Sequence, residues 1–144
     1  ASFEMWGQQK LTAVTPSILL DTFNLNTVSV MRVTQALLPL IARPGGKIIL
    51  MTSLMGSISD NGSGGHYGYR CAKAAMNMMG KSMALDLKDE GISVGLVHPG
   101  AVTTGFAGDP SKLPEKMKAH QHDVATSTKG VLEAIDATTL DTTG

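Results

Sequence analysis

A chain of 144 residues is long enough to form one domain with a buried core of its own. Its 12 basic and 12 acidic side chains balance, which gives no electrostatic reason to expect nucleic acid or an anionic membrane as a partner. No apolar run reaches membrane-spanning length, and the single cysteine, Cys71, excludes an internal disulfide, so a cytoplasmic location is expected.

The first expected element is a long amphipathic helix over about residues 17–42. Thr15-Pro16 is typical of a helix start, with proline at the first helical position. Apolar side chains then recur at three-, four- and seven-residue spacings and form one stripe before the breaker cluster Pro44-Gly45-Gly46. The stripe consists of Leu19, Phe23, Val30, Val33, Leu37 and Leu40.

Two short apolar runs, over residues 47–53 and 92–98, predict strands, the first of them buried on both faces. A polar loop over residues 54–67 and a second long helix from about Gly68 to Leu87 lie between them, with Gly91 placed to end that helix. The order strand, helix, strand predicts parallel pairing, so the fold class is α/β.

The region after the second strand has less pattern. Residues 101–126 are expected to be irregular, and a last helix follows, with Thr126 and Ser127 as its two candidate caps. The scattered His98, His120 and His122 have no metal-ligand spacing, so no metal site is expected.

Polar residues of chemical interest fall where the two strands end. Ser53 closes the first strand, Pro99-Gly100 follow the second, and Tyr69 begins the helix that leaves the polar loop at the same edge. Ligands of open α/β sheets bind beyond the carboxyl ends of the strands. The sequence therefore predicts one candidate site at this edge.

Tyr69 and Lys73 are four residues apart on the expected helix, so their side chains share a face. A phenol has a pKa of about 10, and a nearby ammonium lowers it, which suits a general acid/base. Ser53 is placed to hold a substrate carbonyl. Taken alone the spacing is a weak signal, because a lysine stem often lies across a ring on a helix surface. Tyr67 competes for the role, but its i+4 residue is Cys71, which supplies no cation.

Three segments together resemble the short-chain dehydrogenase/reductase signature, with a context similar to the C-factor-like branch. They are Leu50–Gly56, Tyr69–Ala75 and His98–Thr104, and the similarity extends from about Ile18 to Ile135. The resemblance implies a Rossmann-like doubly wound parallel sheet. Residues 1–144 would be a single partial domain, the catalytic part, without the dinucleotide-binding half and the last strand.

The family's catalytic roles carry over onto four residues. The resemblance implies that Tyr69 is the acid/base, that Lys73 lowers its pKa and holds the nicotinamide ribose, and that Ser53 orients the carbonyl. Asn26 would anchor a water that leads protons to Lys73, with Asn24 as a competing assignment.

The implied cofactor is NAD or NADP. Pro99 and Gly100 would lie against its nicotinamide, while Val102 and Thr104 would meet the carboxamide and the adjoining phosphates. The chain has no G-x-G-x-x-G turn, and the residue that selects NAD or NADP is expected outside it.

The ends, Ala1 and Thr142-Thr143-Gly144, suggest cuts through a longer protein, with a processed terminus as the alternative. A shortened sheet leaves strand edges unpaired, so the chain is expected to need missing sequence, a partner chain or self-association. The family resemblance implies a homo-oligomer through the two long helices, about 17–42 and 68–88.

The expected function is NAD(P)-dependent oxidation or reduction of a small-molecule alcohol or carbonyl by an incomplete copy of the enzyme. The alternatives are a non-enzymatic binding or signalling module derived from the family, and an inert truncated product. The pocket-lining candidates are Met55, Asp60, Asn61, His66 and Phe106.

Overall fold

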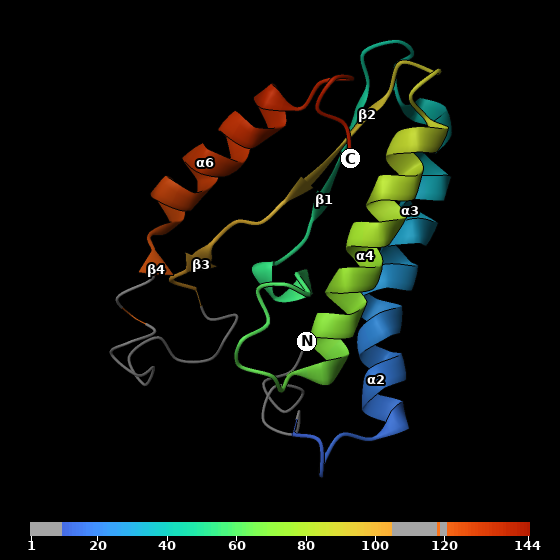
Figure 1. Cartoon of the computed structure of the whole chain (residues 1–144). Helices are drawn as coiled ribbons and strands as arrows, with labels where there is room; N and C mark the ends of the chain where they lie inside the picture. Colours follow the sequence, from blue (N-terminus) through green and yellow to red (C-terminus); the bar gives the residue numbers. More distant parts are fainter. Residues whose placement is uncertain (1–9, 105–117, 119–120) are drawn as a thin grey trace.

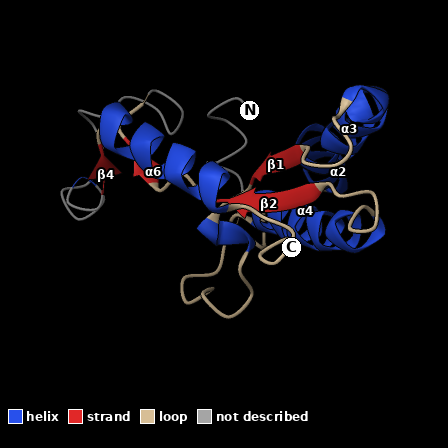
Figure 2. Ribbon diagram, turned by 90° about the horizontal axis from the view of Figure 1, so that it is seen from above, coloured by secondary structure: helices blue, strands red, loops and turns tan. Residues whose placement is uncertain are grey.

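In a computed structural model of the chain, the structure describes residues 10–104, 118 and 121–144. Two parallel strands, β1 (Lys47–Met51) and β2 (Ser93–Val97), form a small sheet between helices (Figures 1 and 2). Helix α4 (Tyr67–Asp86) packs on one face of this sheet, and α6 (Val124–Ala137) contacts β2 from the other side. The expected α/β class and parallel pairing are confirmed.

The sheet faces follow the alternation of side chains along each strand. Ile48 pairs with Val94 and Leu50 with Leu96, and this face lies under α4, where Gly80 meets both leucines. Gly95, on the opposite face, lies against Thr138 just after α6. The expectation that the first strand is buried on both faces is wrong for β1, since α6 contacts β2 and leaves Ile49 half-buried.

The first long helix is a composite of four helical segments. They are α2 (Pro16–Phe23), the π-helical turn η1 (Asn24–Val28), α3 (Ser29–Leu37) and the 3₁₀ turn η2 (Leu38–Leu40). Its predicted start is confirmed, because the Thr15 hydroxyl accepts a hydrogen bond from the Ile18 amide at 3.3 Å.

The π turn changes which side chains of this composite helix face the core. A π turn takes more residues than an α turn, so a stripe drawn at constant 3.6-residue spacing rotates out of phase across it. The prediction of one continuous buried stripe is wrong: Leu19 and Phe23, before the π turn, are 37% and 39% exposed, and Val33, Leu37 and Leu40, after it, are 58%, 51% and 80% exposed. The side chains that pack against the core are Val30, Met31, Leu38 and Ile41.

A glycine-dependent turn connects α4 to β2 and lies beside the turn that precedes β1. Helix α4 ends at Asp86 with Leu87 as its C-cap, close to the predicted end, and Gly91 closes the turn that follows instead of the helix itself. Gly91 has φ +71°, and a Cβ there would come within 2.6 Å of the Pro44 ring. The Gly45 amide donates to the Gly91 carbonyl at 2.8 Å, which joins the turns before β1 and β2.

The segment after β2 contains a second pair of strands that was not expected. β3 (Ala101–Val102) pairs in parallel with β4 (Gln121–His122). The following helix, α6, is capped by Asp123, whose carboxylate accepts from the Thr126 amide at 2.7 Å. Thr126 and Ser127 are therefore wrong as caps, because they lie inside the first turn.

Candidate active site

The candidate residues lie where β1 and β2 end and α4 begins. Thr52 and Ser53 directly follow β1, and the Thr52 amide extends the sheet by donating to the Val97 carbonyl at 2.8 Å. Tyr69 and Lys73 occupy the first two turns of α4. The predicted convergence of Ser53, Tyr69 and Lys73 is what the structure shows.

Ser53 starts the 3₁₀ turn η3 (Leu54–Gly56) with an extended backbone. Its hydroxyl oxygen accepts a hydrogen bond from the Met55 amide at 3.2 Å and also bonds to the Tyr69 side chain. A hydroxyl both donates and accepts, so Ser53 connects a fixed backbone amide to the phenol.

The Tyr69 phenol is part-buried, and this burial raises its pKa, while the Ser53 hydrogen bond acts in the opposite, lowering direction. The sequence predicted a pKa lowered by Lys73, whereas the net direction in the structure is upward. Burial is the largest cause, because desolvation disfavours the charged phenolate.

Lys73 is buried, with 7% of its surface exposed, and its ammonium donates to the Met51 carbonyl at 2.9 Å. The same nitrogen lies 5.6 Å from the centroid of the Tyr69 ring. Burial lowers the pKa of Lys73. The alternative explanation for this spacing was a lysine whose stem lies across a ring on the helix surface. It does not fit Lys73, because this ammonium is buried and hydrogen-bonded.

The two asparagines that compete for one role differ in environment. Asn26, in η1, is part-buried and donates from its amide to the Thr22 carbonyl at 3.0 Å, whereas Asn24 is exposed. The next residue, Thr27, is buried and donates to the Ala72 carbonyl of α4 at 2.9 Å. This contact places η1 beside the helix turn that carries Lys73. The position favours Asn26 over Asn24 as the residue that would anchor a water leading to Lys73.

The residues after β2 are held by several hydrogen bonds. The Pro99 carbonyl accepts from the Ser127 hydroxyl at 2.7 Å, and the Thr104 amide donates to the Val102 carbonyl at 2.8 Å. Gly100 has φ +83°, and a Cβ there would lie 2.9 Å from the His122 ring. Only glycine fits this turn without strain, because of its positive φ and the adjacent His122 ring.

Two polar residues of α4 were missed by the sequence reasoning. The Arg70 guanidinium donates to the Met55 carbonyl at 3.5 Å and to the Ser63 hydroxyl at 2.9 Å, so it fixes the loop between Ser53 and Tyr69. Asn77 bonds to Thr52, just before Ser53, and to Gly56, three residues after it. Its position four residues after Lys73 was the available signal.

The pocket-lining candidates are spread along the loop. Met55 is in η3, Asp60 and Asn61 are exposed, and His66 precedes α4 with φ +50°. Phe106 lies outside the described residues, as does His120, one of the histidines for which no metal-ligand spacing was found. Among the residues that the structure describes, no three or more metal-binding side chains are grouped.

The fold and the site define an α/β protein with a serine, a tyrosine and a lysine grouped at the carboxyl ends of parallel strands. A family model for short chain dehydrogenases matches residues 5–113. The chain therefore belongs to the short-chain dehydrogenase/reductase family, as the signature resemblance predicted. In its described part, no helix is long and apolar enough to cross a membrane.

Individual relatives support the same assignment. The chain is 40% identical over 117 residues to the C-signal protein of Myxococcus xanthus, covering 80% of this chain and 64% of that one. The solved carbonyl reductase Sniffer of D. melanogaster superposes with TM-score 0.79 at 34% identity, over 93% of this chain and 55% of that one.

A third relative is the NADPH-bound carbonyl reductase from chicken fatty liver, with TM-score 0.81 at 25% identity. The match covers 94% of this chain and 56% of that one. The chain thus spans little more than half of the solved relatives, which agrees with the expected incomplete Rossmann-like sheet.

Proposed function

We propose that the chain is the catalytic part of an NAD(P)-dependent oxidoreductase that interconverts a small carbonyl compound and its alcohol. The observation that carries the proposal is the grouping of Ser53, Tyr69 and the buried Lys73 ammonium at one sheet edge. The carbonyl reductases among the structural relatives support this class of substrate.

Proton transfer is the task of Tyr69. During reduction, the Tyr69 hydroxyl donates its proton to the oxygen of the carbonyl as negative charge develops there, and in the reverse direction the phenolate removes the alcohol proton. Ser53, held by the Met55 amide, donates a hydrogen bond to the same oxygen and fixes its distance from Tyr69. Lys73 stabilises the phenolate by its positive charge.

The donor set fits a nicotinamide dinucleotide. The Lys73 ammonium has three N–H donors, of which one bonds to the Met51 carbonyl at 2.9 Å and one to the Met76 sulfur at 3.9 Å, so one donor remains for a ribose hydroxyl. Gly100 follows β2 at the same sheet edge, with the His122 ring against it, and Pro99, Val102 and Thr104 belong to the same segment. When bound, the nicotinamide supplies or accepts the hydride.

The test measures cofactor binding and turnover separately. We expect NADPH or NADH fluorescence to change on titration with the chain, and NADPH oxidation with 4-nitrobenzaldehyde as the carbonyl probe. Tyr69→Phe should lower kcat/KM by about 10²–10⁴-fold, the typical contribution of a general acid. Tyr67→Phe is the matched control and should retain activity. Full activity of Tyr69→Phe would exclude this mechanism.

A second candidate, a non-enzymatic signalling module, is favoured by the name of the Myxococcus xanthus relative, C-signal. The two candidates differ in cofactor binding. A folded, monodisperse chain that binds neither NADPH nor NADH supports the signalling module, and binding with turnover supports the enzyme.

We also propose that the chain self-associates through α2, α3 and α4. Large apolar side chains are exposed along them, including Leu20 at 63%, Val33 at 58% and Met78 at 69%. Their contact with a second copy removes this surface from water. Light scattering should give a dimeric or larger mass, and Val33→Lys should shift it to the monomer.

A further inference from the structure

Three side chains of α4 that follow one another at four-residue spacing hold the end of β1. Tyr69 bonds to Ser53, the Lys73 ammonium bonds to the Met51 carbonyl, and Asn77 receives the hydrogen bond of the Thr52 hydroxyl. Residues spaced by four lie on one face of a helix. Asn77 is therefore the third member of a single polar row, and the proposed proton-transfer chemistry leaves it without a task.

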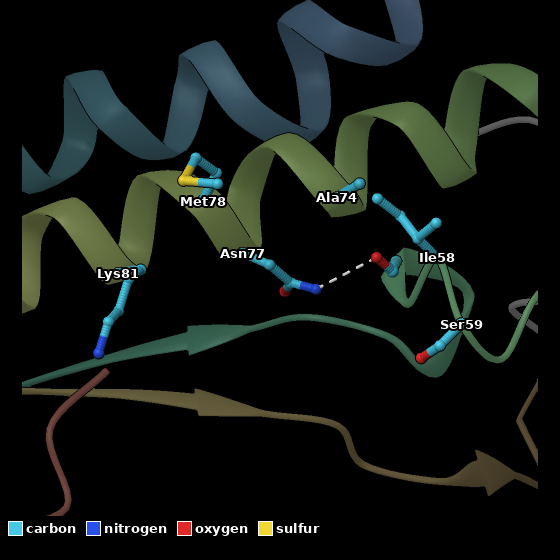
Figure 3. Close-up of a pocket in the computed structure, with 7 residues that line it drawn as sticks. Ile58, Ser59, Ala74, Asn77, Met78 and Lys81 are labelled. Atoms are coloured by element: carbon cyan, nitrogen blue, oxygen red, sulfur yellow. Dashed lines mark hydrogen bonds between the residues drawn. The ribbon is translucent and has the colours of Figure 1, made fainter.

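Asn77 also reaches the other side of Ser53. Its amide nitrogen donates to the Gly56 carbonyl at 3.4 Å, the interaction drawn as a dashed line in Figure 3. A carbonyl oxygen only accepts, so the Asn77 nitrogen must face Gly56 and its oxygen must face the Thr52 hydroxyl. One side chain thus bonds to the residue before Ser53 and to the last residue of the turn that Ser53 begins.

The packing around Gly56 keeps this turn close to α4. A Cβ on Gly56 would lie 2.8 Å from the Lys73 carbonyl carbon and 3.0 Å from the Asn77 amide nitrogen. The Gly56 amide donates in turn to the Ser53 carbonyl at 2.9 Å. The backbone of Ser53 is consequently restrained from both directions by contacts that pass through Asn77.

We propose that Asn77 is a positioning residue that fixes the Ser53 hydroxyl against Tyr69 by bonding to Thr52 and Gly56. The inference rests on the proposed function, in which Ser53 and Tyr69 act on one substrate oxygen. Asn77 touches neither the substrate oxygen nor the transferred proton. It acts by holding the Ser53 hydroxyl in position beside the Tyr69 phenol.

The chain offers a readout that needs no substrate. It has two tyrosines, Tyr67 and Tyr69, so in a Tyr67→Phe background the phenolate absorbance reports Tyr69 alone. The Ser53 hydrogen bond lowers the pKa of Tyr69, so Ser53→Ala should shift the titration to higher pH. Asn77→Ala should give a shift in the same direction, because the loosened serine bonds to the phenol for less of the time.

Thr52→Val tests the same link with nearly unchanged shape and provides a second variant if Asn77→Ala fails to fold. It removes the hydroxyl that bonds to Asn77 and should also raise the pKa of Tyr69. Thr52→Ser keeps a hydroxyl at this position, so the pKa of Tyr69 should stay at its wild-type value. Thr138→Val is the matched control: Thr138 is buried, and its hydroxyl donates to the Ala134 carbonyl at 2.8 Å, remote from Ser53. This control should leave the titration unchanged.

The outcomes separate the two proposals. If Ser53→Ala shifts the titration while Asn77→Ala and Thr52→Val do not, the positioning role of Asn77 is overturned and the proposed function stands. If Ser53→Ala causes no shift, the Ser53–Tyr69 pair that both proposals need is absent. If Thr138→Val shifts it equally, the effect is general loosening, which also overturns the positioning role.

Discussion

The close approach of Gly56 to α4 leads to a prediction that compares two glycines of the same loop. In Gly56→Ala, the new Cβ would lie 2.8 Å from the Lys73 carbonyl carbon. Ordinary carbon contacts begin at about 3.5 Å, so η3 and α4 must separate by about 0.7 Å. Overpacking of this kind costs about 1–3 kcal/mol. Alanine also lowers the entropy of the unfolded chain, which offsets about 0.4–1 kcal/mol of that cost.

The net loss should be at most about 2.6 kcal/mol, and about 1.3 kcal/mol at the centre of these ranges, which lowers Tm by roughly 3–5 °C in a domain of this size. The matched control is Gly62→Ala, because a Cβ on Gly62 meets nothing within 4 Å. At Gly62 alanine only lowers the entropy of the unfolded chain, so we expect the free energy of unfolding to rise by about 0.4–1 kcal/mol. Urea unfolding followed by circular dichroism measures both variants. A midpoint for Gly56→Ala at or above that of Gly62→Ala would refute the packing argument.

Three further predictions concern stability. Leu50→Ala should destabilise the fold by about 3 kcal/mol in urea unfolding, because it leaves a cavity under α4. Burial lowers the pKa of Lys73, so the unfolded chain binds this proton more strongly, and stability should rise with pH towards 10.5. Urea titrations across that range should show a smaller rise in Lys73→Met. Hydrogen bonds from Thr126 lower the pKa of Asp123, so this cap stabilises above 3.8 and is lost as pH falls. Asp123→Ala should lower Tm at neutral pH, and acid should remove the difference.

The parts of the fold that the sequence predicted correctly depend on local signals. The apolar runs of β1 and β2 are bounded by turn residues, and the helix between them forces their parallel pairing. The spacing of Tyr69 and Lys73 puts both on one helix face, and the strand end brings Ser53 to them. Each of these inferences uses only neighbours along the chain and a general rule of sheet topology.

The parts that failed depend on three-dimensional surroundings. The π turn over Asn24–Val28 leaves no mark in the apolar pattern, yet it turns the helix face that follows. The pKa of Tyr69 moves upward because of its burial, which the sequence does not contain. Thr126 has the side chain of a cap, but a stronger acceptor three residues earlier, Asp123, takes that position.

Helix α4 carries Tyr69 and Lys73 and also packs on the sheet, so changes in this packing should affect the candidate active site. Gly80 of α4 lies so close to the sheet that a Cβ there would come within 2.4 Å of Leu96 and 3.0 Å of Leu50. The close packing of α4 on η3 depends on Gly56, and its packing on the leucine side chains of the sheet depends on Gly80. Tyr69 and Ser53 belong to opposite sides of the contact at Gly56, so we expect a substitution that widens this contact to weaken their hydrogen bond. Leu50→Ala leaves the small residues in place and should reduce stability with little change in the Tyr69 titration, whereas Gly56→Ala should alter both.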